Sequence, residues 1–258
     1  MKKSLVPEAC RKQQAIMSKH YTRAIVHMLF AGLIAGAAIA PPSAHAQDSP
    51  TVLGKTIGEW SVEWWKWALA IPTSENPMLD PTGANCHLGQ QGPVWFLAGV
   101  WGGGTAERSC SVPTGKYIFF SIANVIWIQT PEDDKLEPHC KDNETCWRQH
   151  ANDFLPPSIG GELEATLDGN PIIFNPDTPI IRSQSPLFTA SFPPDNVFGL
   201  DLSQLTDRPI VSDGFWVMLP PLSPGDHTLH FRAGLGKNKG QAKKNLKQDV
   251  TYHLKVGP

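Results

Sequence analysis

The sequence lacks the short motifs that mark several large enzyme classes. It contains no G-x-S-x-G elbow of an α/β-hydrolase, no H-E-x-x-H helix of a zinc protease and no phosphate-binding P-loop. These absences favour a non-catalytic protein. A secreted hydrolase stays as an alternative, because catalytic groups can come from separate loops that only the fold brings together.

The chain also lacks a hydrophobic run that is long and apolar enough to predict a membrane span. Its main apolar run, Ile25–Ala40, is short and rich in glycine and alanine. Basic residues within 19–23 precede this run, and the small-x-small pattern Ala44–Ala46 follows it, an order typical of a secretory signal peptide. We therefore expect residues 1–46 to be a leader. Residues 47–258 should form one exported β-rich domain, periplasmic or secreted, with no membrane span after cleavage.

The expected mature domain, residues 47–258, carries no excess of positive charge. The leader holds six of the 22 basic residues but only one of the 24 acidic residues, so the rest of the chain is net acidic. A net-acidic surface argues against general nucleic-acid binding and against binding to anionic membranes.

The segment ahead of Met17 precedes an already complete signal, which favours an over-long start and translation from Met17.

Four cysteines lie in the expected mature domain: Cys86, Cys110, Cys140 and Cys146. An even number in an exported chain indicates two disulfides, for which three pairings exist. We favour Cys86–Cys110 and Cys140–Cys146, because each bond closes a loop that looks irregular. A metal site is the disfavoured alternative, since zinc ligands are usually more closely spaced and the chain has no C-x-x-C pair.

Turn residues are abundant and separate short apolar runs. The chain has 22 glycines and 24 prolines, a texture typical of an all-β domain. The expected strands are Val94–Gly99, Lys116–Ile128, Glu162–Leu167, Pro171–Phe174, Leu187–Phe192, Phe215–Leu219, Thr228–Phe231 and Val250–Val256. An Asp168-Gly169 turn joins the third and fourth of them. We predict a mainly β fold, an antiparallel β-sandwich of immunoglobulin-like or jelly-roll type.

One helix interrupts this pattern at the start of the domain. Thr56–Ile71 places Trp60, Trp64 and Trp67 on one face, and Pro72 ends it. We expect this tryptophan-rich helix to pack on the sandwich. Trp65 projects off that face, so an aromatic platform for a sugar or another planar ligand is the alternative. A second short helix is expected at Cys146–Leu155.

The loop between the first helix and the first strand is the best candidate for a ligand site. Its polar side chains Asp80, Asn85, His87 and Gln90 lie between aromatic segments, a combination typical of ligand sites. Together with Trp65 they are the predicted ligand-binding residues. For a hydrolase, Asp80 and His87 could supply an acid/base pair, but the sequence places no nucleophile or second carboxylate beside them.

Two charged loops suggest further ligands. Carboxylates from Glu132 to Glu144 cluster in an irregular acidic stretch, where Ca²⁺ is an alternative to a plain solvated loop, and no cofactor is otherwise expected. Five lysines between Lys237 and Lys247 could contact an anionic polymer. Arg182 is expected to form a structural ion pair inside the sandwich.

Several phrases along the chain carry a resemblance to a family. They are EWSVEWWKWALAIP, NPMLDPTGANCHLGQQGPVWFLAG, RSCSVPTGKYIFF, RSQSPLF and DGFWVMLPPLSPGDHTLHF. In these phrases the chain resembles a family of uncharacterised exported bacterial proteins with a tryptophan-rich N-terminal helix. The resemblance implies one exported domain and assigns no catalytic residue. We expect a non-catalytic protein that binds a carbohydrate or another envelope component, and a structural subunit of an envelope assembly is a further alternative.

Overall fold

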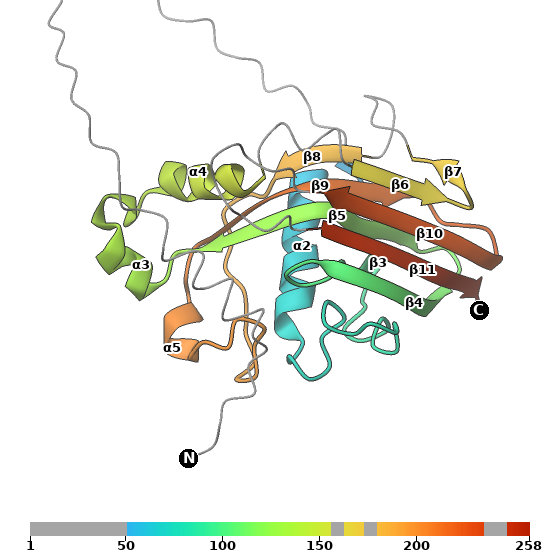
Figure 1. Cartoon of the computed structure of the whole chain (residues 1–258), viewed down its shortest axis with the longest axis horizontal. Coiled ribbons are helices and arrows are strands. Elements are labelled where there is room, and N and C mark those ends of the chain that lie inside the picture. Colours follow the sequence, from blue (N-terminus) through green and yellow to red (C-terminus); the bar gives the residue numbers. More distant parts are fainter. Residues whose placement is uncertain (1–50, 156–162, 173–179, 235–246) are drawn as a thin grey trace, which may run out of the picture. The chain divides into compact units, whose positions relative to one another are not determined.

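Two β-sheets pack face to face, and one helix covers the outer face of the smaller sheet (Figure 1). The computed structural model describes residues 51–155, 163–172, 180–234 and 247–258. The expected leader, at 1–46, and most of the lysine-rich loop lie outside the described residues. Residues Thr51–Pro258 form one compact unit. Within the described part of the chain, no helix is long and apolar enough to cross a membrane.

Each sheet combines strands from distant parts of the chain. The smaller sheet has the order β3 (Val94–Leu97), β5 (Tyr117–Ile128), β9 (Ile210–Leu219) and β8 (Ile180–Gln184). The larger sheet has the order β4 (Gly104–Pro113), β11 (Lys247–Gly257), β10 (Gly225–Gly234), β6 (Leu163–Leu167) and β7 (Asn170–Pro171). The predicted β-sandwich with a helix packed on it is confirmed. Its sheets are mixed, because β3 runs parallel to β5, and β4 runs parallel to β11.

The core between the sheets follows from strict alternation along the strands. On β11, Tyr252 and Leu254 are buried while His253 and Lys255 are exposed. The inward side chains of β5 and β9 meet those of β10 and β11 in one apolar cluster. Because successive side chains point to opposite faces, this register leaves the outer face of the larger sheet to polar residues.

The tryptophan-rich helix is α2 (Ile57–Ala70), within one residue of the predicted bounds at each end. Thr56 caps it: its hydroxyl accepts from the Glu59 backbone N–H at 3.2 Å, and its own N–H donates to Glu59 Oε2 at 2.7 Å. The backbone N–H and then the hydroxyl of Thr56 lower the pKa of the Glu59 carboxyl. This reciprocal pair is a capping box, which satisfies two donors that a helix start leaves open.

All four tryptophans of α2 are buried against the smaller sheet. Three of them donate their indole N–H to backbone carbonyls: Trp60 to Val52, Trp64 to Leu97 and Trp67 to Leu88, at 2.8–3.0 Å. These three rings therefore enter the core with their polar atoms satisfied, which removes most of the cost of burying an N–H group. The indole N–H of Trp65 has no hydrogen-bond partner among the described residues.

Several local predictions hold in the structure. Asp168 and Gly169, with φ of 51° and 77°, form the two-residue turn between β6 and β7. The second helix is α4 (Glu144–Phe154). The disulfides are the two favoured pairs: Cys86–Cys110, with Cα atoms 6.0 Å apart, and Cys140–Cys146, with Cα atoms 5.4 Å apart.

Other predictions were wrong. Leu187–Phe192 forms no strand, and its one β-bridge joins Phe188 to Ile210. The acidic stretch expected to be irregular contains α3 (Pro131–Leu136) and the 3₁₀ turn η1 (Pro138–Cys140). The strands β4 and β8 were not foreseen. The remaining short elements are β1 (Thr51–Val52), β2 (Lys55–Thr56) and α5 (Leu202–Leu205).

Candidate functional site

The tryptophans of α2 form no surface platform. Trp65, the predicted ligand-binding ring, is 2% exposed and packs edge-to-face on Trp64 with ring centroids 4.9 Å apart. Stacking on a sugar needs a ring whose face reaches solvent. The platform expectation is therefore corrected: the helix uses its aromatic rings to fill the core.

Asp80 organises the loop in which it lies. Its Oδ1 accepts from the backbone N–H of Thr82 at 2.8 Å and from its hydroxyl at 2.7 Å, and its Oδ2 accepts from the Asn85 N–H at 2.9 Å. Burial alone would raise the pKa of the Asp80 carboxyl, but these hydrogen bonds from Asn85 and Thr82 outweigh it and lower the pKa. A carboxylate held this way is a structural acceptor and a poor general acid.

The other predicted site residues have separate roles. Gln90 bridges the loop to β3: its amide donates to the carbonyls of Cys86 and Phe96 and accepts from the Phe96 N–H. His87 is exposed, and its Nδ1 lies 3.0 Å from the Ala84 carbonyl. Among the described residues no hydrogen bond joins Asp80 to His87, the two residues expected to supply an acid/base pair for a hydrolase.

A buried arginine, which sequence reasoning missed, anchors this loop to the sandwich. Arg108, on β4, is 1% exposed and donates to the carbonyls of Asp80 at 2.7 Å and Ala98 at 2.5 Å. It also donates to the Tyr252 hydroxyl at 2.8 Å. Burial raises the pKa of Tyr252, so this hydroxyl stays neutral and can both accept and donate. The predicted loop site is thus a structural junction.

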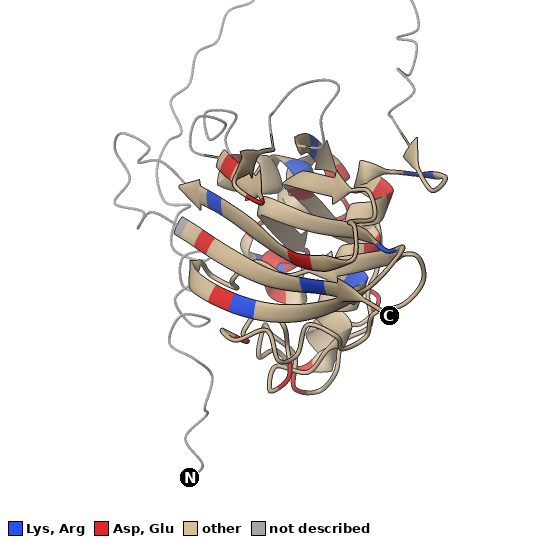
Figure 2. Cartoon of the chain, turned by 90° about the vertical axis from the view of Figure 1, so that its right-hand side faces the viewer, with Lys and Arg blue, Asp and Glu red and all other residues tan. Residues whose placement is uncertain are grey.

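Polar residues occupy the outward positions on the strands of the larger sheet, and Figure 2 marks the acidic and basic positions on these strands. One ionisable pair crosses each of the three strand junctions from β4 to β6: Glu107–His253 from β4 to β11 at 2.9 Å, Asp249–His230 from β11 to β10 at 2.8 Å, and Arg232–Glu164 from β10 to β6 at 2.5 Å. Threonine and serine hydroxyls fill the positions between the pairs: Thr105, Ser109, Ser111, Thr166, Thr228 and Thr251. The face can therefore offer donors and acceptors side by side on rigid strands.

A fourth pair joins the turn between β6 and β7 to the start of β10, and both of its groups have shifted pKa values. His227 Nδ1 lies 2.7 Å from Asp168 Oδ2, which raises the pKa of His227, with the Ser223 carbonyl adding to the effect. The same bond with His227, and then the Thr228 N–H, lowers the pKa of Asp168. The pair therefore stabilises the fold above the ordinary Asp pKa of 3.8 and below the ordinary His pKa of 6.5. Its contribution is lost as the pH rises through the raised His227 pKa or falls through the lowered Asp168 pKa.

Asp168→Asn should remove this pH-dependent contribution while keeping the turn, because asparagine also tolerates positive φ. An exposed pair contributes about 0.2–1 kcal/mol. The wild-type melting temperature should therefore exceed that of the variant by a few degrees at most between about pH 4 and 6.5, and by less at pH 9. Thermal melts at several pH values measure this. Asp207→Asn, at another exposed aspartate with positive φ, is the control and should show no such window.

In the acidic stretch, Asp133, Asp134 and Glu144 each interact with a different partner. Asp133 caps α3 through Thr130, Asp134 pairs with Arg208 at 3.3 Å, and Glu144 pairs with Arg148 at 2.6 Å. These carboxylates do not share the single centre that a calcium site needs. The donors that do converge there are different: atoms of Glu137, His139, Cys140 and Cys146 all lie within 4.8 Å of one another.

Sequence reasoning missed the outer-face pairs and the convergence around the second disulfide. The alternation on β10 and β11 predicts which residues point outward, but only the strand order decides which of them meet. Comparisons with protein-family models, with curated proteins and with solved structures find no match for this chain.

Proposed function

We propose that this chain is an exported, non-catalytic β-sandwich protein that binds a carbohydrate of the cell envelope through the outer face of its larger sheet. One observation carries the proposal: an ionisable pair crosses each of the three strand junctions from β4 to β6. The predicted leader and the two disulfides support a location outside the cytoplasm.

The chemistry of the face suits a ligand rich in hydroxyl groups. Carboxylates accept hydrogen bonds, guanidinium groups donate them, and imidazole, serine and threonine can do either. A sugar hydroxyl both donates and accepts, so it can insert between the members of a pair such as Glu107–His253. The mixture of charges disfavours a strongly anionic polymer. The described strands of the larger sheet carry no exposed large apolar side chain, which disfavours an apolar partner.

Removing the three carboxylates tests the surface. We expect the triple variant Glu107→Gln, Glu164→Gln, Asp249→Asn to bind envelope polysaccharide at least tenfold more weakly than wild type, since three charge-assisted hydrogen-bonding sites are lost. Affinity electrophoresis in soluble polysaccharides and co-sedimentation with peptidoglycan measure the binding.

Glu132→Gln with Lys135→Gln is the matched control, because it removes an exposed ion pair on α3, away from the sheet. This variant should bind as wild type does. Binding of the triple variant at wild-type strength would exclude the outer face. Absence of wild-type binding to every polysaccharide tried would reject the function itself.

A further inference from the structure

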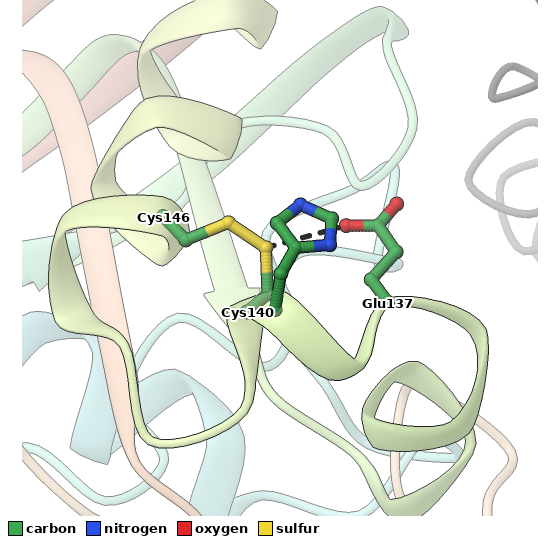
Figure 3. Close-up of side chains that lie close together, drawn as sticks. Glu137, Cys140 and Cys146 are labelled. Atoms are coloured by element: carbon green, nitrogen blue, oxygen red, sulfur yellow. Dashed lines mark hydrogen bonds between the residues drawn. A yellow bond between two sulfur atoms is a disulfide. The ribbon is translucent and has the colours of Figure 1, made fainter.

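Side chains of types that can bind metal ions surround the Cys140–Cys146 disulfide. His150 Nε2 lies 3.4 Å from Cys140 Sγ and 3.8 Å from Cys146 Sγ. Glu137 Oε2 lies 2.9 Å from His150 Nε2 and 3.4 Å from Cys140 Sγ, and Figure 3 shows the Glu137 carboxylate turned towards the bonded sulfur atoms. Ligand atoms around a tetrahedral zinc ion are about 3.4–3.8 Å apart, given bonds of about 2.0–2.3 Å to the metal. The distances from His150 Nε2 and Glu137 Oε2 to the sulfur atoms therefore already match that spacing, whereas the hydrogen-bonded nitrogen and oxygen atoms would have to move apart by about 0.5 Å to share a zinc ion.

The disulfide alone does not account for this convergence. Two cysteines at this Cα separation can bond without an imidazole or a carboxylate beside them. The surroundings are also shielded: Cys140 is fully buried, and the side chains of His150 and Glu137 are 8% and 17% exposed. A divalent cation would contact all four donor groups together.

The scaffold around the cluster holds these donors in place. Cys146 and His150 are four residues apart on α4, so both project from the same face of the helix. The Trp147 indole N–H donates to the Cys140 carbonyl at 2.8 Å, which ties η1 to α4. The Trp127 ring stacks on His150 with centroids 4.1 Å apart and so restrains the imidazole. Donors held by packed neighbours need little rearrangement to bind a metal.

We propose that Glu137, Cys140, Cys146 and His150 bind a zinc-type divalent cation when the Cys140–Cys146 disulfide is reduced. The disulfide and the metal complex are then alternative states of one site. Two thiolates, an imidazole and a carboxylate suit zinc, while Ca²⁺ prefers a shell of oxygen atoms. His139 contributes a further donor close to this set. The inference is independent of the carbohydrate-binding surface.

The two states interconvert by a balanced exchange with an external dithiol. The dithiol gives two electrons and two protons to the disulfide, so the S–S bond breaks, two S–H bonds form and the dithiol becomes a disulfide. Zinc then replaces the two thiol protons, which are released as two Zn–S bonds form. In the oxidised protein the sulfur atoms carry no thiolate charge, so the cation loses two of its ligands.

Cobalt titration tests the site directly. The purified protein is reduced with a phosphine, freed of reductant without oxygen, and titrated with Co²⁺, whose thiolate complexes show sulfur-to-metal charge-transfer absorption. We expect one equivalent of Co²⁺ to bind to reduced protein, Zn²⁺ to displace it, and oxidised protein to bind none. Zn²⁺ at a hundredfold excess over its Kd should raise the melting temperature of the reduced protein by about 5–10 °C.

Variants identify the ligands. Cys140→Ser with Cys146→Ser should abolish the charge-transfer band, and His150→Gln or Glu137→Gln should each weaken binding at least tenfold. Cys86→Ser with Cys110→Ser removes the other cysteine pair and should keep the band. Glu132→Gln, at an exposed carboxylate on neighbouring α3, is a milder control that should also keep it. Far-UV circular dichroism checks that each variant is folded.

Three results would overturn the proposal. The first is reduced wild-type protein that binds no Co²⁺. The second is oxidised protein that binds Co²⁺ as tightly as reduced protein does, and the third is an unchanged band in the Cys140→Ser, Cys146→Ser variant. The wild-type comparison of the two redox states needs no substitution, so the test stands even where a variant does not fold.

Discussion

Replacing Trp64 with alanine should lower the free energy of unfolding by about 3–5 kcal/mol. The Trp64 ring is 2% exposed and meets the rings of Trp65, Trp67 and Trp216 at centroid distances of 4.9, 5.8 and 5.5 Å. Alanine would leave a cavity among these rings and would remove the donor to the Leu97 carbonyl. Denaturant unfolding followed by far-UV circular dichroism measures the change without relying on tryptophan emission.

Two conservative variants separate the packing of the ring from its hydrogen bond. Trp64→Phe keeps an aromatic ring but leaves the Leu97 carbonyl without its partner. Trp65→Phe removes an indole N–H that has no hydrogen-bond partner among the described residues. We therefore expect Trp64→Phe to destabilise by about 1 kcal/mol more than Trp65→Phe. Equal losses would show that the hydrogen bond contributes nothing, and a loss under about 1 kcal/mol for Trp64→Ala would contradict its place in the core.

Replacing Arg182 with methionine should cost about 3–5 kcal/mol, because it strips a buried carboxylate of its charged partner. Asp213 is 1% exposed, and its two carboxylate oxygens accept from Arg182 at 2.8 and 3.2 Å. Arg182 also donates to Asn152 Oδ1 and to the Leu155 carbonyl, so it joins β8 and β9 to the end of α4. The structural ion pair predicted for Arg182 is thus confirmed.

An exposed pair of the same chemistry provides the control. Arg232 and Glu164 also form two hydrogen bonds, but their side chains are 52% and 56% exposed. Arg232→Met should cost far less than Arg182→Met, because solvent screens an exposed pair. The double variant Arg182→Met, Asp213→Leu should lose less than the sum of the two single variants, since no charge is left buried. Similar losses for Arg182→Met and Arg232→Met would show that burial of Asp213 does not matter.

The predicted elements that the structure retains depend on short-range signals. The Thr56 and Glu59 capping box and Pro72 bracket α2, and Asp168-Gly169 marks the β6–β7 turn. Alternation of apolar and polar residues likewise predicts β10 and β11, although both strands extend further than expected. Such signals act within a few residues, so they can be read from the chain without knowing its partners.

The missed strands lack a local signal. β4 consists of small and polar residues with Arg108 at an inward position, which hides its alternation. It becomes a strand because it pairs in parallel with β11, near the other end of the chain. Conversely, Leu187–Phe192 has the composition of a strand but forms only one β-bridge, between Phe188 and Ile210. Pairing with a distant partner overrides composition in both segments.

The candidate sites likewise combine features that the sequence predicts with features that only the tertiary structure determines. The chain alone indicates the fold class, the helix and the favoured cysteine pairs, because periodicity, capping and turn chemistry are local properties. It also spaces Cys146 and His150 one helical turn apart, a signal that could have drawn attention to the cluster. Tertiary packing decides that Trp65 is buried, that the Asp80 loop is a structural junction and that Glu137 turns back onto His150. It also decides that one ionisable pair spans each of the three strand junctions from β4 to β6. These outcomes depend on strand order, register and the docking of helices, which arise from contacts between segments far apart in the chain.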